Sequence, residues 1–267
     1  MDHNDEITIR SSFAIRALSF LRHSTFMLRH LKEIRHSPLM EPTRLLLFDI
    51  DGTLVNTGGA GVESLKTTVC SRFGATDDLH DIEIAGKTDR AIIRDILRKY
   101  QVDPNEESIA SFAQDYIHRL PLSLSRSRGR VLPGIRRLLE RLRPQPNIVL
   151  ALLTGNLQQG AKLKLQHYGL LEFFEFGAFA DDHHDRNELG AFARERAQMR
   201  HGHDFDAAEI DVIGDTNHDI ACGKAFGART IAVATGSWSR ERLQACAPDF
   251  LFDDLSNTVE VIKKLGW

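Results

Sequence analysis

The chain of 267 residues carries 34 Lys and Arg against 37 Asp and Glu, a formal net charge of −3. No basic patch interleaved with aromatic residues argues for nucleic acid, and no apolar run approaches the ~20 residues that a transmembrane helix needs, so we expect neither nucleic acid nor a membrane as a partner. The length favours a core domain with a smaller second domain. Three widely separated cysteines without a CxxC pair predict reduced thiols in a cytoplasmic protein: Cys70, Cys222 and Cys246.

The first 42 residues precede the first predicted strand and combine basic residues with Phe and Leu. Such a segment is compatible with a transit peptide, a basic amphipathic helix, or a start upstream of a true initiator at Met40. Acidic residues near the start argue against a transit peptide: Asp2, Asp5 and Glu6. We therefore predict that residues 1–42 are a dispensable N-terminal extension.

The first predicted strand ends in two closely spaced carboxylates. Its apolar run, 45–48, is typical of a strand buried on both faces of a parallel sheet. Asp49 and Asp51 follow, and side chains two residues apart on an extended segment point to the same side, here the carboxyl edge where open α/β sheets bind ligands. Gly52 then turns the chain away. Two like charges this close indicate a metal site, an acid/base pair, or both; a structural Asp-Gly turn is the alternative.

A helical insertion follows this turn. A hinge is predicted by three closely spaced glycines, Gly58, Gly59 and Gly61. Apolar periodicity then predicts three helices, at about 61–74, 88–101 and 105–118. These helices form the predicted cap, residues 58–128.

The remaining segments, 43–57 and 129–267, are assigned to an α/β core. A helix is predicted at 135–142, and the strands that follow are expected at about 147–153, 176–180, 210–213, 229–234 and 249–252. Helices between them would cover the sheet through right-handed crossovers. This alternation predicts a doubly wound fold with a parallel sheet.

Polar residues also follow two of the later strands. Thr154, Gly155 and Asn156 follow the strand at 147–153, and a hydroxyl at a strand end with free amides at a helix start can bind a phosphoryl group. Asp215 and Asp219 follow the strand at 210–213. Three strand ends thus bring polar groups to one edge of the sheet.

With these motifs in this order, the chain resembles the haloacid dehalogenase superfamily of hydrolases, in its phosphoglycolate phosphatase-like type. Asp49-Ile-Asp51-Gly-Thr-Leu54 matches the first motif, Thr154 the second, and Gly214-Asp215-x-x-x-Asp219 the last. The resemblance implies a Rossmann-like core with an inserted α-helical cap. It also implies magnesium-dependent hydrolysis of small phosphate monoesters, either phosphoglycolate-like or sugar phosphates, through an aspartyl-phosphate.

The two acids of the first motif can divide the chemistry between them. Because phosphate monoesters hydrolyse extremely slowly unaided, a carboxylate nucleophile helps by splitting the displacement into two steps. We assign this role to Asp49, the first acid after the buried strand, and general acid/base catalysis to Asp51. The resemblance implies the same roles, with the Asp49 side chain, the Asp51 carbonyl and the Asp215 side chain as Mg²⁺ ligands. Asp219 would orient a metal-bound water or a neighbouring group, or simply serve as a helix N-terminal acid.

The chain departs from the family pattern in one basic residue. The family usually places a lysine ahead of a proline-containing segment to bind the phosphoryl group, and no Lys-Pro occurs between Thr154 and Asp215. Arg186 occupies the corresponding region, and its guanidinium can bind a phosphoryl group through two donors. Lys162 and Lys164 compete for this role, but on the helix after Thr154 we expect both to be solvated.

Lys87 lies in a loop, 85–89, that resembles the segment with which caps of this family reach the active site. It is therefore a candidate for substrate binding, with a solvated lysine as the alternative.

Three other functions stay open. A sugar-phosphate mutase shares the fold, the cap and both acids, and is the nearest rival. A haloacid dehalogenase typically lacks the second acid, so Asp51 favours phosphate chemistry. A non-catalytic binding protein would not require Asp49, Asp51, Thr154 and Asp215 together. The sequence leaves the physiological substrate and the oligomeric state open.

Overall fold

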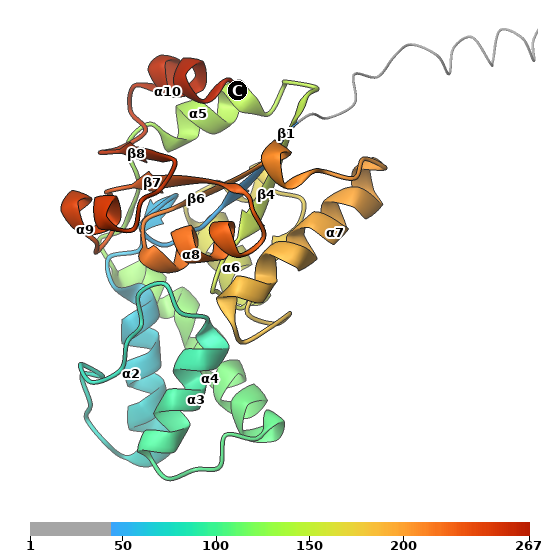
Figure 1. Cartoon of the computed structure of the whole chain (residues 1–267). Coiled ribbons are helices and arrows are strands. Elements are labelled where there is room, and N and C mark those ends of the chain that lie inside the picture. The colour runs from blue at the N-terminus through green and yellow to red at the C-terminus, as the bar shows by residue number, and fades with distance from the viewer. Residues whose placement is uncertain (1–43) are drawn as a thin grey trace, which may run out of the picture. The chain divides into compact units, whose positions relative to one another are not determined.

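The computed structural model describes residues 44–267, so the expectation about residues 1–42 lies outside the described part. Its main feature is a sheet of six strands whose neighbours all pair in parallel. In spatial order the strands are β5 (Gly177–Ala178), β4 (Ile148–Leu153), β1 (Arg44–Phe48), β6 (Ile210–Gly214), β7 (Arg229–Val233) and β8 (Phe250–Phe252). The predicted doubly wound α/β fold is confirmed (Figure 1).

Strand β1 lies in the middle of the sheet and is buried on both faces. Leu46 and Phe48 pack with α5 (Ile135–Leu142), α6 (Gln158–His167) and α10 (Thr258–Leu265). Leu45 and Leu47 point to the other face and pack with α7 (Leu189–His201) and α8 (Asn217–Ala225). Each such side chain contributes roughly 1.5–3 kcal/mol when fully buried, which explains why the strand carries only apolar residues after Arg44.

The strand order creates a switch point beside β1. The chain continues from β1 to β4 and β5 on one side, and later to β6, β7 and β8 on the other. Ligands of open α/β sheets bind at the carboxyl edge where the order reverses. The residues after β1 and β6 therefore lie at the position where a ligand site is expected.

At the amino edge of the sheet a buried carboxylate joins three strands. Asp211, on β6, accepts hydrogen bonds from Arg44 of β1 (3.1 Å) and from two guanidinium nitrogens of Arg229 on β7 (2.5 and 2.7 Å). Trp267 Nε1 also donates to it, over 2.5 Å. Because every oxygen of this buried carboxylate has a partner, the network ties the C-terminal residue to the sheet without leaving an unpaired charge.

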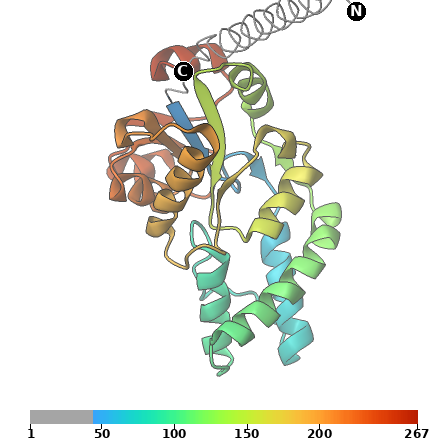
Figure 2. The same cartoon turned by 90° about the vertical axis from the view of Figure 1, so that its right-hand side faces the viewer.

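Three helices make up the segment that we propose as the cap, residues 58–128: α2 (Ala60–Phe73), α3 (Asp89–Lys99) and α4 (Glu106–Arg126). They share an apolar cluster that includes Val69, Ile93 and Phe112, and they gather at one end of the molecule (Figures 1 and 2). Residues 44–267 belong to one compact unit, so these helices and the core pack as a single body.

Helix α4 is longer than the sequence indicated, ending at Arg126 instead of about residue 118. Pro121 lies inside it and removes one backbone donor. The helix continues because Leu120 and Leu124 are buried against Ala60 of α2 and Leu163 of α6. Tertiary packing therefore outweighs the local effect of the proline.

A short antiparallel ribbon connects this segment to the core. It consists of β2 (Val55–Asn56) and β3 (Arg130–Val131), which flank the three helices. Strands of two residues are too short for a periodic pattern, so the sequence could not reveal them. The remaining described elements are α9 (Arg240–Ala245) and the 3₁₀ helices η1 (Leu171–Phe173), η2 (Arg186–Glu188) and η3 (Ala207–Glu209). Among the described helices, none is both long and apolar enough to cross a membrane.

Candidate active site

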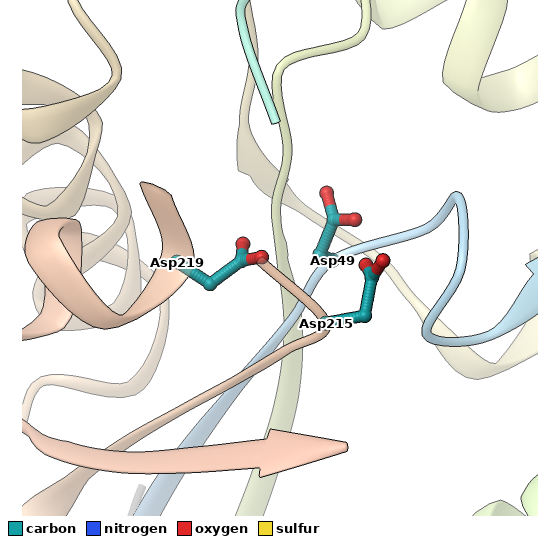
Figure 3. A group of neighbouring side chains, drawn as sticks. All are labelled: Asp49, Asp215 and Asp219. Atoms are coloured by element: carbon teal, nitrogen blue, oxygen red, sulfur yellow. The ribbon is translucent and has the colours of Figure 1, made fainter. Parts of the chain in front are cut away.

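Three buried carboxylates converge at the carboxyl edge of the sheet (Figure 3). Asp49 directly follows β1, Asp215 follows β6, and Asp219 lies in the first turn of α8. Each offers an oxygen, and these oxygens all lie within 4.8 Å of one another. Side chains predicted from separate strand ends are thus brought together.

Two glycines make room for the Asp215 carboxylate. A Cβ atom at Gly52 would lie 2.3 Å from Asp215 Oδ2, and one at Gly236 would lie 1.7 Å from the same oxygen. Gly52 also has a φ of +83°, which other residues rarely adopt. Thr53, in the same turn, donates from Oγ1 to Asp215 Oδ1 over 3.2 Å. The Asp-Gly turn of the first motif therefore shapes the site in addition to ending the strand.

Asp219 has both of its oxygens occupied within the protein. Its Oδ2 accepts hydrogen bonds from the backbone N–H and the hydroxyl of Thr216, which caps α8 (2.9 and 2.7 Å). Its Oδ1 accepts from Arg186 Nη2 over 2.5 Å. Asp219 is thus both a helix N-terminal acid and a partner of Arg186.

Arg186 lies buried between two carboxylates. Its Nη2 donates to Asp49 Oδ1 over 2.8 Å as well as to Asp219, and its Nη1 donates to the carbonyl of Gly86 over 3.0 Å. In the sequence, Arg186 lies in the region where the family usually has its phosphoryl-binding lysine. In the structure, its guanidinium contacts Asp49.

Negative charge exceeds positive charge around these groups. Burial raises the pKa of Asp49 to about 6 against the lowering effect of Arg186, and the neighbouring Asp219 and Asp51 raise it further. Burial also raises the pKa of Asp215 well above its usual value, with Asp219 and Asp49 adding to the effect. One guanidinium does not balance three buried carboxylates. Because the set offers only oxygen ligands, it fits a hard divalent cation.

Asp51 faces the cleft beside these groups. Its Oδ2 accepts hydrogen bonds from Lys164 Nζ (2.5 Å) and Asn156 Nδ2 (2.9 Å), and its Oδ1 accepts a longer one from Thr57 Oγ1 (3.4 Å). The cleft has a volume of about 400 Å³ and is lined by Asp49, Asp51 and Asp215 from the core and by Lys87 from the proposed cap. A larger hollow of about 680 Å³ between α6 and α7 contains none of the carboxylates, so volume alone would indicate the wrong place.

The prediction that Lys164 is solvated is wrong. Its side chain is only 4% exposed, whereas Lys162 is exposed as expected. The reason is its position on α6, where Ala161, Lys164 and Leu165 share the buried face. A lysine at helical spacing from buried apolar residues was the signal in the sequence, and it was outweighed by the usual preference of lysine for solvent.

The strand end at Thr154 differs in part from the prediction. Thr154 is buried and its Oγ1 accepts hydrogen bonds from Asn156, through the backbone N–H (3.3 Å) and the side-chain amide (2.8 Å). The expected free amides at the start of α6 are taken, because Leu157 N donates to Asp89 and Gln158 N donates to Asp181. Of the residues predicted here to bind a phosphoryl group, Gly155 and Asn156 line the cleft, whereas Thr154 is fully buried and is not among its lining residues.

A contact between the proposed cap and the core was missed in the sequence. Asp89, the first residue of α3, accepts from Leu157 N over 2.8 Å, and its own N–H donates to the Gly155 carbonyl over 2.6 Å. Thr88 Oγ1 donates to the His184 carbonyl over 2.6 Å. Lys87 is paired with Asp95 (3.2 Å) and Glu83 (3.5 Å). In the sequence, Thr88 and Asp89 are typical of a helix start. Nothing in it indicated that they would also contact His184 and Leu157.

Comparison with known proteins agrees with this geometry. A sequence profile described as haloacid dehalogenase-like hydrolase matches residues 46–233. The chain belongs to this family. The probable phosphatase IndB of Dickeya dadantii (strain 3937) is 28% identical over 228 residues, covering 80% of this chain and 91% of that protein. The pyrophosphatase PpaX of Bacillus cereus (strain B4264) is 24% identical over 222 residues, covering 83% of this chain and 97% of that protein.

The fold comparison gives the same family architecture. CbbY from Rhodobacter sphaeroides, solved in complex with phosphate, superposes with a TM-score of 0.65 at 19% identity, covering 80% of this chain and 95% of that one. The resemblance inferred from the motifs is therefore confirmed, and the chain is an enzyme, a phosphatase of the haloacid dehalogenase-like family. Phosphatases of this family generally use a divalent metal, which agrees with the buried acidic cluster.

Asp89 in this phosphatase is expected to make stability depend on pH. Burial raises its pKa to about 6 in the folded state, against about 3.9 in an unfolded chain. The folded protein therefore binds this proton more tightly, so the associated stability is present below pH ~4 and is lost as the pH rises through ~6. Asp89→Asn should remove up to about 3 kcal/mol of this dependence. Urea unfolding of the wild-type protein and of Asp89→Asn between these pH values measures the difference. Free energies of unfolding that change in parallel with pH in the two proteins would contradict the prediction.

Proposed function

We propose that the protein is a magnesium-dependent phosphatase that hydrolyses small phosphate monoesters through an aspartyl-phosphate on Asp49. The observation that carries the proposal is the convergence of the Asp49, Asp215 and Asp219 carboxylates, with Arg186 bonded to Asp49 and Asp219 and Asp51 lining the same small cleft. Cytoplasmic location is part of the same proposal.

The metal would be held by the side chains of Asp49 and Asp215 and by the backbone carbonyl of Asp51. Asp219 is left out of this set because Thr216 and Arg186 already occupy its oxygens. When bound, Mg²⁺ would neutralise and orient the non-bridging oxygens of the transferring phosphoryl group.

The first half of the reaction forms the covalent intermediate. Asp49 Oδ2, which accepts no hydrogen bond from the described residues, attacks phosphorus while the bond from phosphorus to the leaving oxygen breaks. Arg186 keeps Oδ1 in place and Asp51 gives its proton to the leaving oxygen. We expect the Thr154 hydroxyl and the Gly155 N–H to donate to phosphoryl oxygens, and Lys87, which lines the cleft with Gly155, would also approach the substrate.

The second half releases phosphate. Asp51, now a carboxylate, takes a proton from water as the water oxygen attacks phosphorus and the bond to Asp49 breaks. Inorganic phosphate leaves, Asp49 returns as a carboxylate, and Asp51 is again protonated. Both acids are therefore regenerated in each cycle.

Release of inorganic phosphate from a panel of monoesters in the presence of MgCl₂ tests the proposal. The panel contains phosphorylated hydroxy acids, such as phosphoglycolate, and sugar monophosphates. One phosphate released per ester consumed supports a phosphatase. Transfer of phosphate between two hydroxyls of a sugar, primed by a sugar bisphosphate and without net phosphate release, would support a mutase of the same fold. Absence of both reactions would overturn the proposal.

Arg186→Ala is expected to lower kcat/KM by about 10²-fold, since removing one donor from developing charge costs about 3 kcal/mol. Arg186→Lys should recover part of the loss, because the charge returns without the planar fork. The matched control is Lys162→Ala, an exposed cation on α6. Thermal melting of each variant with Mg²⁺ separates loss of activity from loss of fold. Wild-type kcat/KM in folded Arg186→Ala would show that the phosphoryl group does not depend on this guanidinium.

A further inference from the structure

Lys164 forms a closed hydrogen-bonded triangle with two cleft residues. Its Nζ donates to Asp51 Oδ2 and to Asn156 Oδ1, each over 2.5 Å, and Asn156 Nδ2 donates to the same Asp51 oxygen over 2.9 Å. Lys164 comes from α6 in the core, whereas Asp51 comes from the turn after β1. The triangle thus joins two segments more than 100 residues apart in sequence.

The triangle distinguishes the two oxygens of Asp51. Oδ2 receives two donors, one of them charged, whereas within residues 44–267 Oδ1 receives only the long contact from Thr57 Oγ1, at 3.4 Å. Charge-assisted hydrogen bonds are roughly twice as strong as neutral ones, so the carboxyl group is held by Oδ2. Because a carboxyl group is planar, holding Oδ2 fixes the direction of Oδ1.

A direct role for Lys164 in holding the phosphoryl group fits the contacts less well. Asp51 and Asn156 occupy two of the three donors of its ammonium group, and Arg186 is the cation that contacts Asp49. Burying an ammonium group is unfavourable unless its charge is matched. Asp51 matches it whenever Asp51 is a carboxylate, and the nearby Asp89 also attracts the ammonium charge. The contacts of Lys164 therefore serve Asp51.

We propose that Lys164 is a positioning residue that locks Asp51 Oδ2 so that Oδ1 faces the leaving oxygen of the substrate. The proposal rests on the acid/base role proposed above for Asp51. As the bond from phosphorus to the leaving oxygen breaks, the proton on Oδ1 moves to that oxygen, and the resulting carboxylate is held by Lys164 and Asn156. Lys164 remains protonated throughout and transfers nothing.

Two substrates that differ in their need for a proton test this role. The phenolate of p-nitrophenyl phosphate leaves with little protonation, whereas the alkoxide of glycerol phosphate needs a proton. Because kcat/KM reports the step that forms the aspartyl-phosphate, it isolates departure of the leaving group. Lys164→Met should lower kcat/KM for glycerol phosphate at least ~10-fold more than for p-nitrophenyl phosphate, since general acid catalysis contributes about 10²–10⁴-fold. Lys162→Met, on the exposed side of α6, should change neither.

Asp51→Asn separates failure of the premise from failure of the proposal. If Asp51 is the acid, this variant shows the same preference for the aryl ester, and adding Lys164→Met to it causes little further loss. Should Asp51→Asn affect both esters equally, the proposed function of Asp51 is wrong. Two outcomes would overturn the positioning role even if Asp51→Asn shows the preference for the aryl ester. In the first, Lys164→Met lowers kcat/KM equally for both esters. In the second, Lys164→Met lowers kcat/KM as much in the Asp51→Asn background as in the wild-type protein. Lys164→Gln keeps a hydrogen-bond donor, so its kcat/KM for glycerol phosphate should fall less than that of Lys164→Met. If the Met variant does not fold, the same comparison of the two esters is made with Lys164→Gln.

Discussion

Asp49→Asn is expected to abolish phosphate release, with kcat at least ~10³-fold below that of the wild-type protein. An amide does not attack phosphorus at a useful rate, and loss of a covalent nucleophile commonly removes most of the rate enhancement. The fold should persist because Asn occupies the same volume and Arg186 keeps its bonds to Asp219 and to the Gly86 carbonyl. Phosphate release from the best ester of the panel measures the effect.

Covalent labelling makes this test specific to the nucleophile. Acid quenching of the wild-type protein with a radiolabelled ester should leave label on the chain, and Asp49→Asn should carry none. Asp204→Asn, the same change at an exposed aspartate, serves as the control and should keep full activity and labelling. Turnover by purified Asp49→Asn near the wild-type rate would remove Asp49 from the mechanism.

Removal of divalent cations should stop hydrolysis, and added Mg²⁺ should restore it. The physical reason is the excess of buried negative charge, since the guanidinium of Arg186 is shared by Asp49 and Asp219 and contributes little to Asp215. Activity after treatment with EDTA, followed by titration with MgCl₂, measures the requirement. Full activity in metal-free buffer would exclude the proposed metal site.

Asp215→Asn should raise the Mg²⁺ concentration for half-maximal activity by more than ~10-fold, because a neutral amide is a weaker ligand than a carboxylate. Asn has nearly the same volume as Asp, so the change keeps the packing of residue 215 against Gly52 and Gly236, whose backbones approach its side chain closely. Glu172→Gln, which removes a surface carboxylate near α6, is the matched control and should leave the requirement unchanged. An unchanged requirement in folded Asp215→Asn would place the metal elsewhere.

Much of this site follows from local sequence. An apolar run that ends in polar residues predicts both a buried strand and a group at its end, and the ends of parallel strands meet at one edge of a sheet. Asp49, Thr154 and Asp215 were found in this way, together with the order of the strands along the chain. The role of Arg186 needed the family pattern as well, since a lone arginine in a loop predicts nothing by itself.

Contacts that depend on how packed segments face one another were not predictable. Lys164 contacts Asp51 because α6 packs with this position inward, and Asp89 contacts Leu157 because α3 begins against the core. The length of α4 depends in the same way on partners from α2 and α6. The pairing of β2 with β3 joins residues on both sides of a long helical segment.

The sequence by itself determined the fold class, the family and the acids at the strand ends, because these depend on periodicity and on residues close together in the chain. The tertiary structure decided which of Lys162 and Lys164 reaches the cleft, which oxygens of Asp219 are already occupied, and how the proposed cap contacts the Gly155 segment. Each of these depends on how a helix or a distant segment docks, which burial of the whole apolar surface determines. Helical spacing indicated which face of α6 is buried, but no local pattern specifies what that face contacts.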